Sequence, residues 1–147
     1  MKKITTNSPE ETQQIAALLI KALLKGSANQ PHIFALQGNL GAGKTTFIQG
    51  VAKALKIKNK ILSPTFVIMK DFDIKSNKNF KKLYHLDCYR FDSPDEINTL
   101  NFKQIIKNPE NLIFIEWPEK IKSFIPKNTL WIKFKVAGKN QREIIIK

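Results

Sequence analysis

The chain is 147 residues long, 42% hydrophobic and formally charged +13, which suits one domain with its own core over residues 1–147. No apolar run approaches the roughly 20 residues of a membrane span, and no apolar stretch follows the basic N-terminus, so we expect neither a membrane partner nor a signal peptide. The single cysteine, Cys88, excludes an internal disulfide and fits a reducing compartment, which predicts a cytoplasmic protein.

The first third of the chain predicts two helices on either side of a buried strand. A capping box with proline at the first helical position, residues 8–11, opens a predicted helix over about residues 9–25. The apolar run 32–37 predicts a buried strand. Apolar residues at helical spacing predict a second helix over residues 44–55.

The rest of the chain is richer in strands. A second capping box, residues 93–96, opens a predicted helix that ends near Asn108, because proline follows there. Strands are predicted over residues 65–70 and 80–86, joined by a hairpin loop at 75–79, and over residues 112–115, 130–136 and 142–146. This order predicts an α/β fold in three layers, with helices on both faces of a mixed, mostly parallel central sheet.

Residues 38–45, Gly-Asn-Leu-Gly-Ala-Gly-Lys-Thr, match the phosphate-binding motif G-x-x-x-x-G-K-[ST] between the predicted strand and helix. The glycines allow backbone N–H groups to converge on phosphate oxygens, and the following helix presents its positive N-terminal end to them. Lys44 would reach the β- and γ-phosphates, and the Thr45 hydroxyl would bind Mg²⁺. We expect a P-loop NTPase-like fold that binds nucleotide through Asn39, Leu40, Gly41, Ala42, Gly43, Lys44, Thr45 and Thr46.

The nucleotide is expected to be ATP with Mg²⁺. A guanine-specific site usually needs an Asn-Lys-x-Asp loop, and the nearest match, Asn77-Lys78-Asn79-Phe80, lacks the aspartate. The sequence therefore favours adenine over guanine.

Two acids follow buried strands and are candidates for the metal and for catalysis. Asp87 and Glu116 would both lie at the carboxyl edge of the sheet, where one could hold Mg²⁺ and the other orient the attacking water. Spacing alone does not assign the two roles, and either could be a solvated strand-end acid. Thr65, in Ser-Pro-Thr-Phe at 63–66, is a candidate sensor of the γ-phosphate, and Arg90 offers either charge stabilisation or a surface salt bridge.

These motifs together resemble the TsaE (YjeE) family of small bacterial P-loop ATPases required for threonylcarbamoyladenosine formation in tRNA. The resemblance runs over nearly the whole chain and includes Ser-Pro-Thr-Phe at 63–66, His-Leu-Asp-Cys-Tyr-Arg at 85–90 and Glu-Trp-Pro-Glu at 116–119. The phosphate loop alone is shared by many families, whereas this ordered combination is specific. Asn39 departs from the family pattern, which usually has aspartate there.

The resemblance implies an accessory ATPase that does not modify the base itself. Its partners would be the threonylcarbamoyl transferase and its paralogue, a TsaD–TsaB heterodimer, and it would meet tRNA indirectly or weakly. By match to the family motifs, the nucleotide and Mg²⁺ site would comprise Lys44, Thr45, Thr65, Asp87 and Glu116, and Thr12 would approach the nucleotide from the first helix. Hydrolysis is expected to be slow in the isolated chain and to rise with partners.

Two other functions compete with this interpretation. A small-molecule P-loop kinase would share the loop, but it usually clamps the transferred phosphoryl group with several arginines, and this chain has only two. A basic RNA-binding module is the second alternative, based on the net charge. Against it, 23 of the 25 basic residues are lysines scattered along the chain, whereas base recognition favours arginine.

Overall fold

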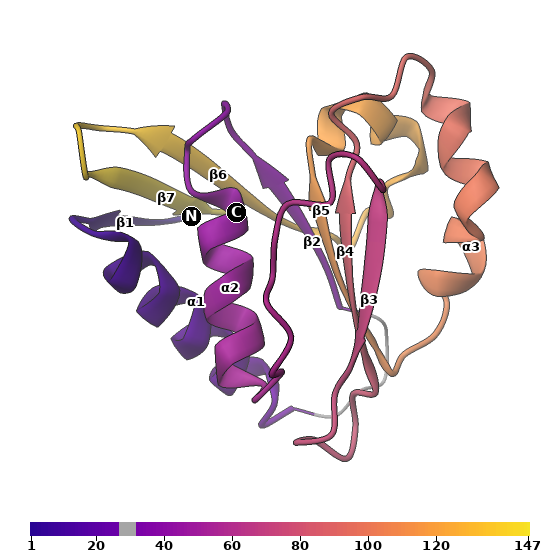
Figure 1. Cartoon of the computed structure of the whole chain (residues 1–147), viewed down its shortest axis with the longest axis horizontal. Helices are drawn as coiled ribbons and strands as arrows, with labels where there is room; N and C mark the ends of the chain where they lie inside the picture. Colours follow the sequence, from indigo (N-terminus) through magenta and orange to yellow (C-terminus); the bar gives the residue numbers. More distant parts are fainter. Residues whose placement is uncertain (27–31) are drawn as a thin grey trace.

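The computed structural model describes residues 1–26 and 32–147, and its strands form one sheet in the order β1-β7-β6-β2-β5-β4-β3 (Figure 1). The strands are β1 (Lys2–Thr6), β2 (His32–Gln37), β3 (Met69–Asp73), β4 (Lys82–Asp87), β5 (Asn111–Glu116), β6 (Leu130–Val136) and β7 (Arg142–Ile146). β6, β2, β5 and β4 pair in parallel, whereas β1, β7 and β3 extend the two edges in antiparallel pairs. The sheet is mixed, as predicted, but it is not mostly parallel, since three of the six strand pairs in the described chain are antiparallel. Parallel pairing is confined to its centre, because hairpins add β3 and β7 at the sides.

Helices cover both faces of the sheet, as predicted. Helices α1 (Pro9–Leu23) and α2 (Lys44–Ala54) lie on one face, and α3 (Phe102–Ile105) lies on the other (Figure 1). Two short 3-10 helices, η1 (Pro94–Leu100) and η2 (Pro118–Phe124), pack with α3 and with each other. Within the described residues, no helix has the length and apolar character needed to cross a bilayer.

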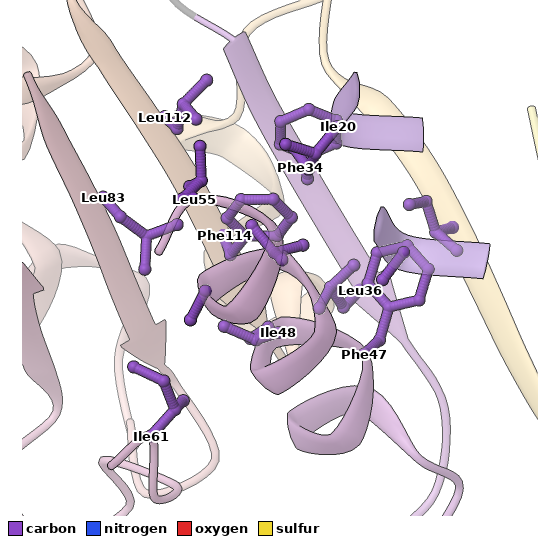
Figure 2. Packing of buried hydrophobic residues seen from close by; sticks show 14 of the residues in the cluster. Ile20, Phe34, Leu36, Phe47, Ile48, Leu55, Ile61, Leu83, Leu112 and Phe114 are labelled. Carbon is purple, nitrogen blue, oxygen red and sulfur yellow. The ribbon is translucent and has the colours of Figure 1, made fainter. Parts of the chain in front are cut away.

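The larger core fills the space between the sheet and the α1–α2 pair (Figure 2). Phe34 on β2 stacks on Phe114 on β5, with ring centroids 4.4 Å apart and planes 7° apart. Gly50 brings α2 unusually close to α1, since a Cβ atom there would lie 2.5 Å from the backbone of Gln13. This contact holds α2, and hence the loop before it, at a fixed place on the sheet.

Local sequence signals account for the helix starts. The Ser8 hydroxyl accepts a hydrogen bond from the Glu11 N–H at 3.1 Å and caps α1. The Glu11 side chain accepts from the Asn7 N–H rather than from the Ser8 N–H, so only half of the capping box predicted at residues 8–11 forms. The capping box predicted at residues 93–96 is complete, with the Glu96 side chain accepting from the Ser93 N–H. The helix after it is shorter than predicted, because Asn101 adopts a left-handed φ of 54° and separates η1 from α3.

One other predicted strand begins later than expected, and two elements were not predicted. Residues 65–68 form a turn, so the strand predicted over 65–70 begins only at Met69. Ile68 has φ of 67° there, a left-handed conformation that ends the turn and is incompatible with a strand. The N-terminal strand β1 and the helix η2 were not predicted, because their sequences are too short to carry a periodic signal.

Candidate functional site

A pocket of about 320 Å³ opens where the loop after β2 meets the carboxyl ends of β4 and β5. Its walls come from five parts of the chain: the start of α1, residues 40–46, the segment at 63–65, the ends of β4 and β5, and residues 139–142 at the start of β7. The lining residues are Ser8, Pro9, Thr12, Leu40, Gly41, Ala42, Gly43, Lys44, Thr45, Thr46, Ser63, Thr65, Asp87, Tyr89, Glu116, Trp117, Lys139, Asn140 and Arg142.

The glycine-rich loop ends directly at the N-terminus of α2. Gly43 is the N-cap residue with φ of 101°, a conformation that side chains strongly disfavour. No side chain caps this helix end, in contrast to α1. The first N–H groups of α2 therefore lie at the pocket and are free for an anionic ligand, which the helix dipole also favours.

Lys44 is buried at the base of this loop. Its Nζ donates hydrogen bonds to the carbonyl oxygens of Gly38 at 2.6 Å and Asn39 at 3.2 Å, and it lies 4.4 Å from the centroid of the Trp117 ring. Burial lowers the pKa of the Lys44 ammonium from its ordinary value, while Glu116 and nearby carboxylates act in the opposite direction. The ammonium is thus largely desolvated, which strengthens its attraction for an incoming anion.

Glu116 connects the loop to the sheet. It is buried at the end of β5, beside β2, and its Oε1 accepts a hydrogen bond from the Thr45 hydroxyl at 2.8 Å. The same oxygen lies 2.9 Å from Nε2 of the buried His85. Register pairing places Asp87 of β4 directly opposite Glu116, so both acids lie at one edge of the sheet, as their strand-end positions predicted.

Asp87 has a separate set of partners. Its Oδ2 accepts hydrogen bonds from Thr65 at 2.7 Å and Ser63 at 2.9 Å, and its Oδ1 accepts from the Tyr89 N–H at 2.9 Å. The Ser-Pro-Thr-Phe turn is thereby tied to the end of β4. The structure thus brings Thr65 into the pocket together with both acids.

Not every residue expected at the site is equally placed. Leu40 to Thr46 line the pocket, whereas Asn39 does not and contributes its carbonyl to Lys44 instead. Thr12 reaches the pocket wall, but its hydroxyl is already bonded to Thr6 at 2.8 Å. Arg90 lies outside the lining, with its guanidinium 4.3 Å from the centroid of the exposed Phe66 ring.

The structure also adds residues that the site predictions lacked. The Arg142 guanidinium donates to the Gly41 carbonyl at 3.1 and 3.3 Å and so braces the loop from β7. Trp117 lies against both Lys44 and the Tyr89 ring. Arg142 is one of only two arginines, which was a usable signal, but its contact with a loop 101 positions away depends on tertiary packing.

The arrangement suits a magnesium–nucleotide complex. In the described residues, no group of three or more His, Cys, Asp and Glu side chains forms a metal centre of its own. Thr45, Glu116 and Asp87 instead offer hard oxygen atoms beside an anion-binding helix end. Mg²⁺ is usually held in this manner, by one or two carboxylates, water and substrate phosphates.

Comparison with known proteins finds relatives that match nearly the whole chain. A sequence profile for the family threonylcarbamoyl adenosine biosynthesis protein TsaE matches residues 6–144. The tRNA threonylcarbamoyladenosine biosynthesis protein TsaE of Bacillus subtilis (strain 168) is 37% identical over 142 residues, which cover 97% of this chain and 82% of the relative. Its namesake from Rickettsia typhi is 38% identical over 144 residues, with 97% and 92% covered.

A solved structure is similar as well. The crystal structure of Bacillus subtilis YdiB superposes with a TM-score of 0.69 at 32% identity, covering 97% of this chain and 82% of that one. Neither the names of these relatives nor this structure favours the small-molecule kinase or the basic RNA-binding module considered above.

Proposed function

The chain belongs to the TsaE family and takes part in tRNA threonylcarbamoyladenosine biosynthesis, and we propose that it does so in the cytoplasm as a P-loop ATPase. The observation that carries this proposal is the uncapped N-terminus of α2 behind a glycine-rich loop, with Lys44 and Thr45 facing two buried acids across one pocket. A triphosphate with Mg²⁺ matches that set of donors and acceptors.

The chain's own residues would bind the nucleotide as follows. Backbone N–H groups of residues 41–46 surround the phosphates, and Lys44 leaves the carbonyls of Gly38 and Asn39 to contact the β- and γ-phosphates. This exchange of partners is available because the Lys44 ammonium is held by carbonyls and an aromatic ring rather than by an ion pair.

We assign different roles to the two acids, metal binding to Glu116 and orientation of water to Asp87. Glu116 already accepts the Thr45 hydroxyl, so we assign these two residues to Mg²⁺, which when bound neutralises charge on the β- and γ-phosphates. Asp87 is bonded to Thr65 and Ser63, so we assign it, with Thr65, to orienting the attacking water. The hydrogen bonds support these roles by placing each acid beside a different loop.

The surface around the pocket supports dependence on a partner. Five large hydrophobic side chains are exposed at or next to the pocket lining. Leu40 and Tyr89 line the pocket, and Leu62, Phe66 and Val67 are close in sequence to the lining residues Ser63 and Thr65. We call these five residues the apolar rim. Leu40 and Phe66 are 83% and 82% exposed, which is costly for an isolated protein and typical of a docking surface. We propose that the threonylcarbamoyl transferase and its paralogue cover this rim, and that tRNA is met indirectly or weakly.

Calorimetry tests the nucleotide assignment. Lys44→Ala should lower Mg-ATP affinity at least about 100-fold, because the only ammonium buried in the loop is lost. Lys53→Ala, in the same helix but exposed, is the matched control and should bind as the wild type does. Equal affinity of the Lys44 variant and the wild type would remove the assignment.

A further inference from the structure

His85 is buried in β4, and none of the roles proposed above involves it. Residues two apart in a strand point to the same face, so His85 and Asp87 both face α2, whose first turn carries Thr45. Glu116 faces the same way from the neighbouring strand, opposite Asp87 in the register. His85 thus lies one step deeper in the sheet than the two acids, opposite Phe114 in the register and diagonal to Glu116.

The two nitrogen atoms of the His85 ring have different surroundings. Nε2 lies 2.9 Å from Oε1 of Glu116, whereas Nδ1 is buried and has no hydrogen-bond partner in the described structure. A carboxylate only accepts hydrogen bonds, so the ring proton belongs on Nε2. The Nε2–H group is therefore the donor that the ring offers to Glu116.

The oxygens of Glu116 consequently differ. Oε1 accepts from both Thr45 and His85, at 2.8 and 2.9 Å, whereas Oε2 accepts no hydrogen bond from the residues that the structure describes. In the proposed function the Thr45 hydroxyl turns to Mg²⁺, which would leave His85 as the donor that still holds Oε1. The carboxylate would otherwise be buried with no fixed orientation.

We infer that His85 is a positioning residue: its Nε2–H holds Oε1 of Glu116 so that Oε2 is presented to the Mg²⁺ of the bound nucleotide. This inference rests on the proposed function, since it concerns the same site. Groups that orient a metal-binding side chain in this manner typically contribute about 10- to 100-fold to metal affinity or activity.

A matched set of variants tests the inference by ATP binding with Mg²⁺ and with a chelator present. His85→Gln keeps an N–H donor at the same number of bonds from Cβ as Nε2, whereas His85→Leu removes the donor. We expect His85→Leu to bind ATP about tenfold or more weakly than the wild type does when Mg²⁺ is present. When the chelator has removed Mg²⁺, the variant and the wild type should bind ATP equally tightly. His85→Gln should stay close to the wild type in both conditions.

Several results would overturn the inference. One is wild-type Mg²⁺ dependence in His85→Leu, and another is an equal loss by both variants with and without Mg²⁺, which indicates packing alone. Should thermal unfolding show that His85→Leu does not fold, His85→Asn, whose amide reaches only the Nδ1 position, takes its place with the same expected loss. A wild-type chain that binds no ATP would remove the proposed function too, whereas unaffected His85 variants of an ATP-binding chain remove only this inference.

Discussion

Cys88 follows the candidate catalytic Asp87 directly, but its thiol points away from the pocket into the second core, among residues such as Ile97 and Ile115. Its backbone N–H donates to the Glu116 carbonyl at 3.1 Å, which continues the pairing of β4 and β5 beyond the strand. Burial raises the pKa of the Cys88 thiol to about 12, with smaller contributions from Asp87 and Glu119. The thiol is therefore neutral in the folded chain.

This raised pKa makes stability depend on pH in the alkaline range. Above the ordinary thiol pKa of 9.0 the unfolded chain loses the proton and the folded chain keeps it, so the free energy of unfolding falls as the pH rises toward 12. The slope from this group is at most about 1.4 kcal/mol per pH unit. Urea unfolding at about pH 8 and about pH 10.5 should show a smaller alkaline loss for Cys88→Ala than for the wild type. Equal losses would contradict the assigned thiol environment.

The residues that form the site could largely be predicted where a sequence motif or a strand end marks them. Lys44, Thr45, Asp87 and Glu116 were expected from the loop pattern and the strand ends, and the structure brings them to one pocket. The positioning role that we infer for His85 could not be predicted from the sequence. It depends on the contact between His85 and Glu116, which the parallel register of β4 and β5 creates and which one sequence does not reveal.

At the scale of elements, the close contact of α1 and α2 positions the phosphate loop. Gly50 makes this approach possible, since a Cβ there would lie 2.5 Å from both the Cα and the carbonyl oxygen of Gln13. The Gln13 and Gln49 side chains, 3.5 Å apart, bridge the same two helices. Because α2 begins at Lys44, any displacement of this helix also moves the site.

Gly50→Ala should therefore destabilise the protein, although alanine is the better helix former. The added methyl group meets backbone rather than a movable side chain, so we expect a loss of about 3 kcal/mol in the free energy of unfolding. Gly138→Ala is the control: its Cβ would meet only the Gln141 side chain, at 3.4 Å, and stability should change little. An increase in the melting temperature of Gly50→Ala would show that the helices are not packed in this way.

Elements with a strong local signal could be predicted, and those set by tertiary packing could not. The caps at Ser8 and Ser93 and the buried runs of β2 and β5 were recognisable in the sequence. The turn at residues 65–68 was taken for a strand because of its apolar composition. Phe66 and Val67 instead face solvent at the apolar rim, whereas Thr65 is bonded to Asp87.

For the whole molecule, the pocket and the apolar rim share one end of the sheet. The loop after β2 supplies Leu40 to the rim and Lys44 to the pocket, so a partner seated on the rim would cover the nucleotide. Exclusion of water by such a partner would strengthen the electrostatic interactions in the pocket. This arrangement accounts for the expected slow hydrolysis by the isolated chain.

Phe66→Ser combined with Val67→Ser should separate docking from nucleotide binding. We expect Mg-ATP affinity within about twofold of the wild type, because neither side chain lines the pocket, but at least about tenfold weaker stimulation by the transferase pair. Leu18→Ser, at a residue 64% exposed on α1 and outside the apolar rim, is the matched control and should leave stimulation unchanged. Full stimulation of the double variant in a turnover assay would place the partner elsewhere.

In the proposed function, the loop between β2 and α2 holds the triphosphate and its metal. A crystal structure grown with Mg²⁺ and a non-hydrolysable ATP analogue would reveal where the phosphates bind. We expect phosphate density against the N-terminus of α2, with Nζ of Lys44 moved from the Gly38 carbonyl to a phosphate oxygen and the Thr45 hydroxyl on the metal. Analogue bound elsewhere, with Lys44 still on the carbonyls of Gly38 and Asn39, would contradict it.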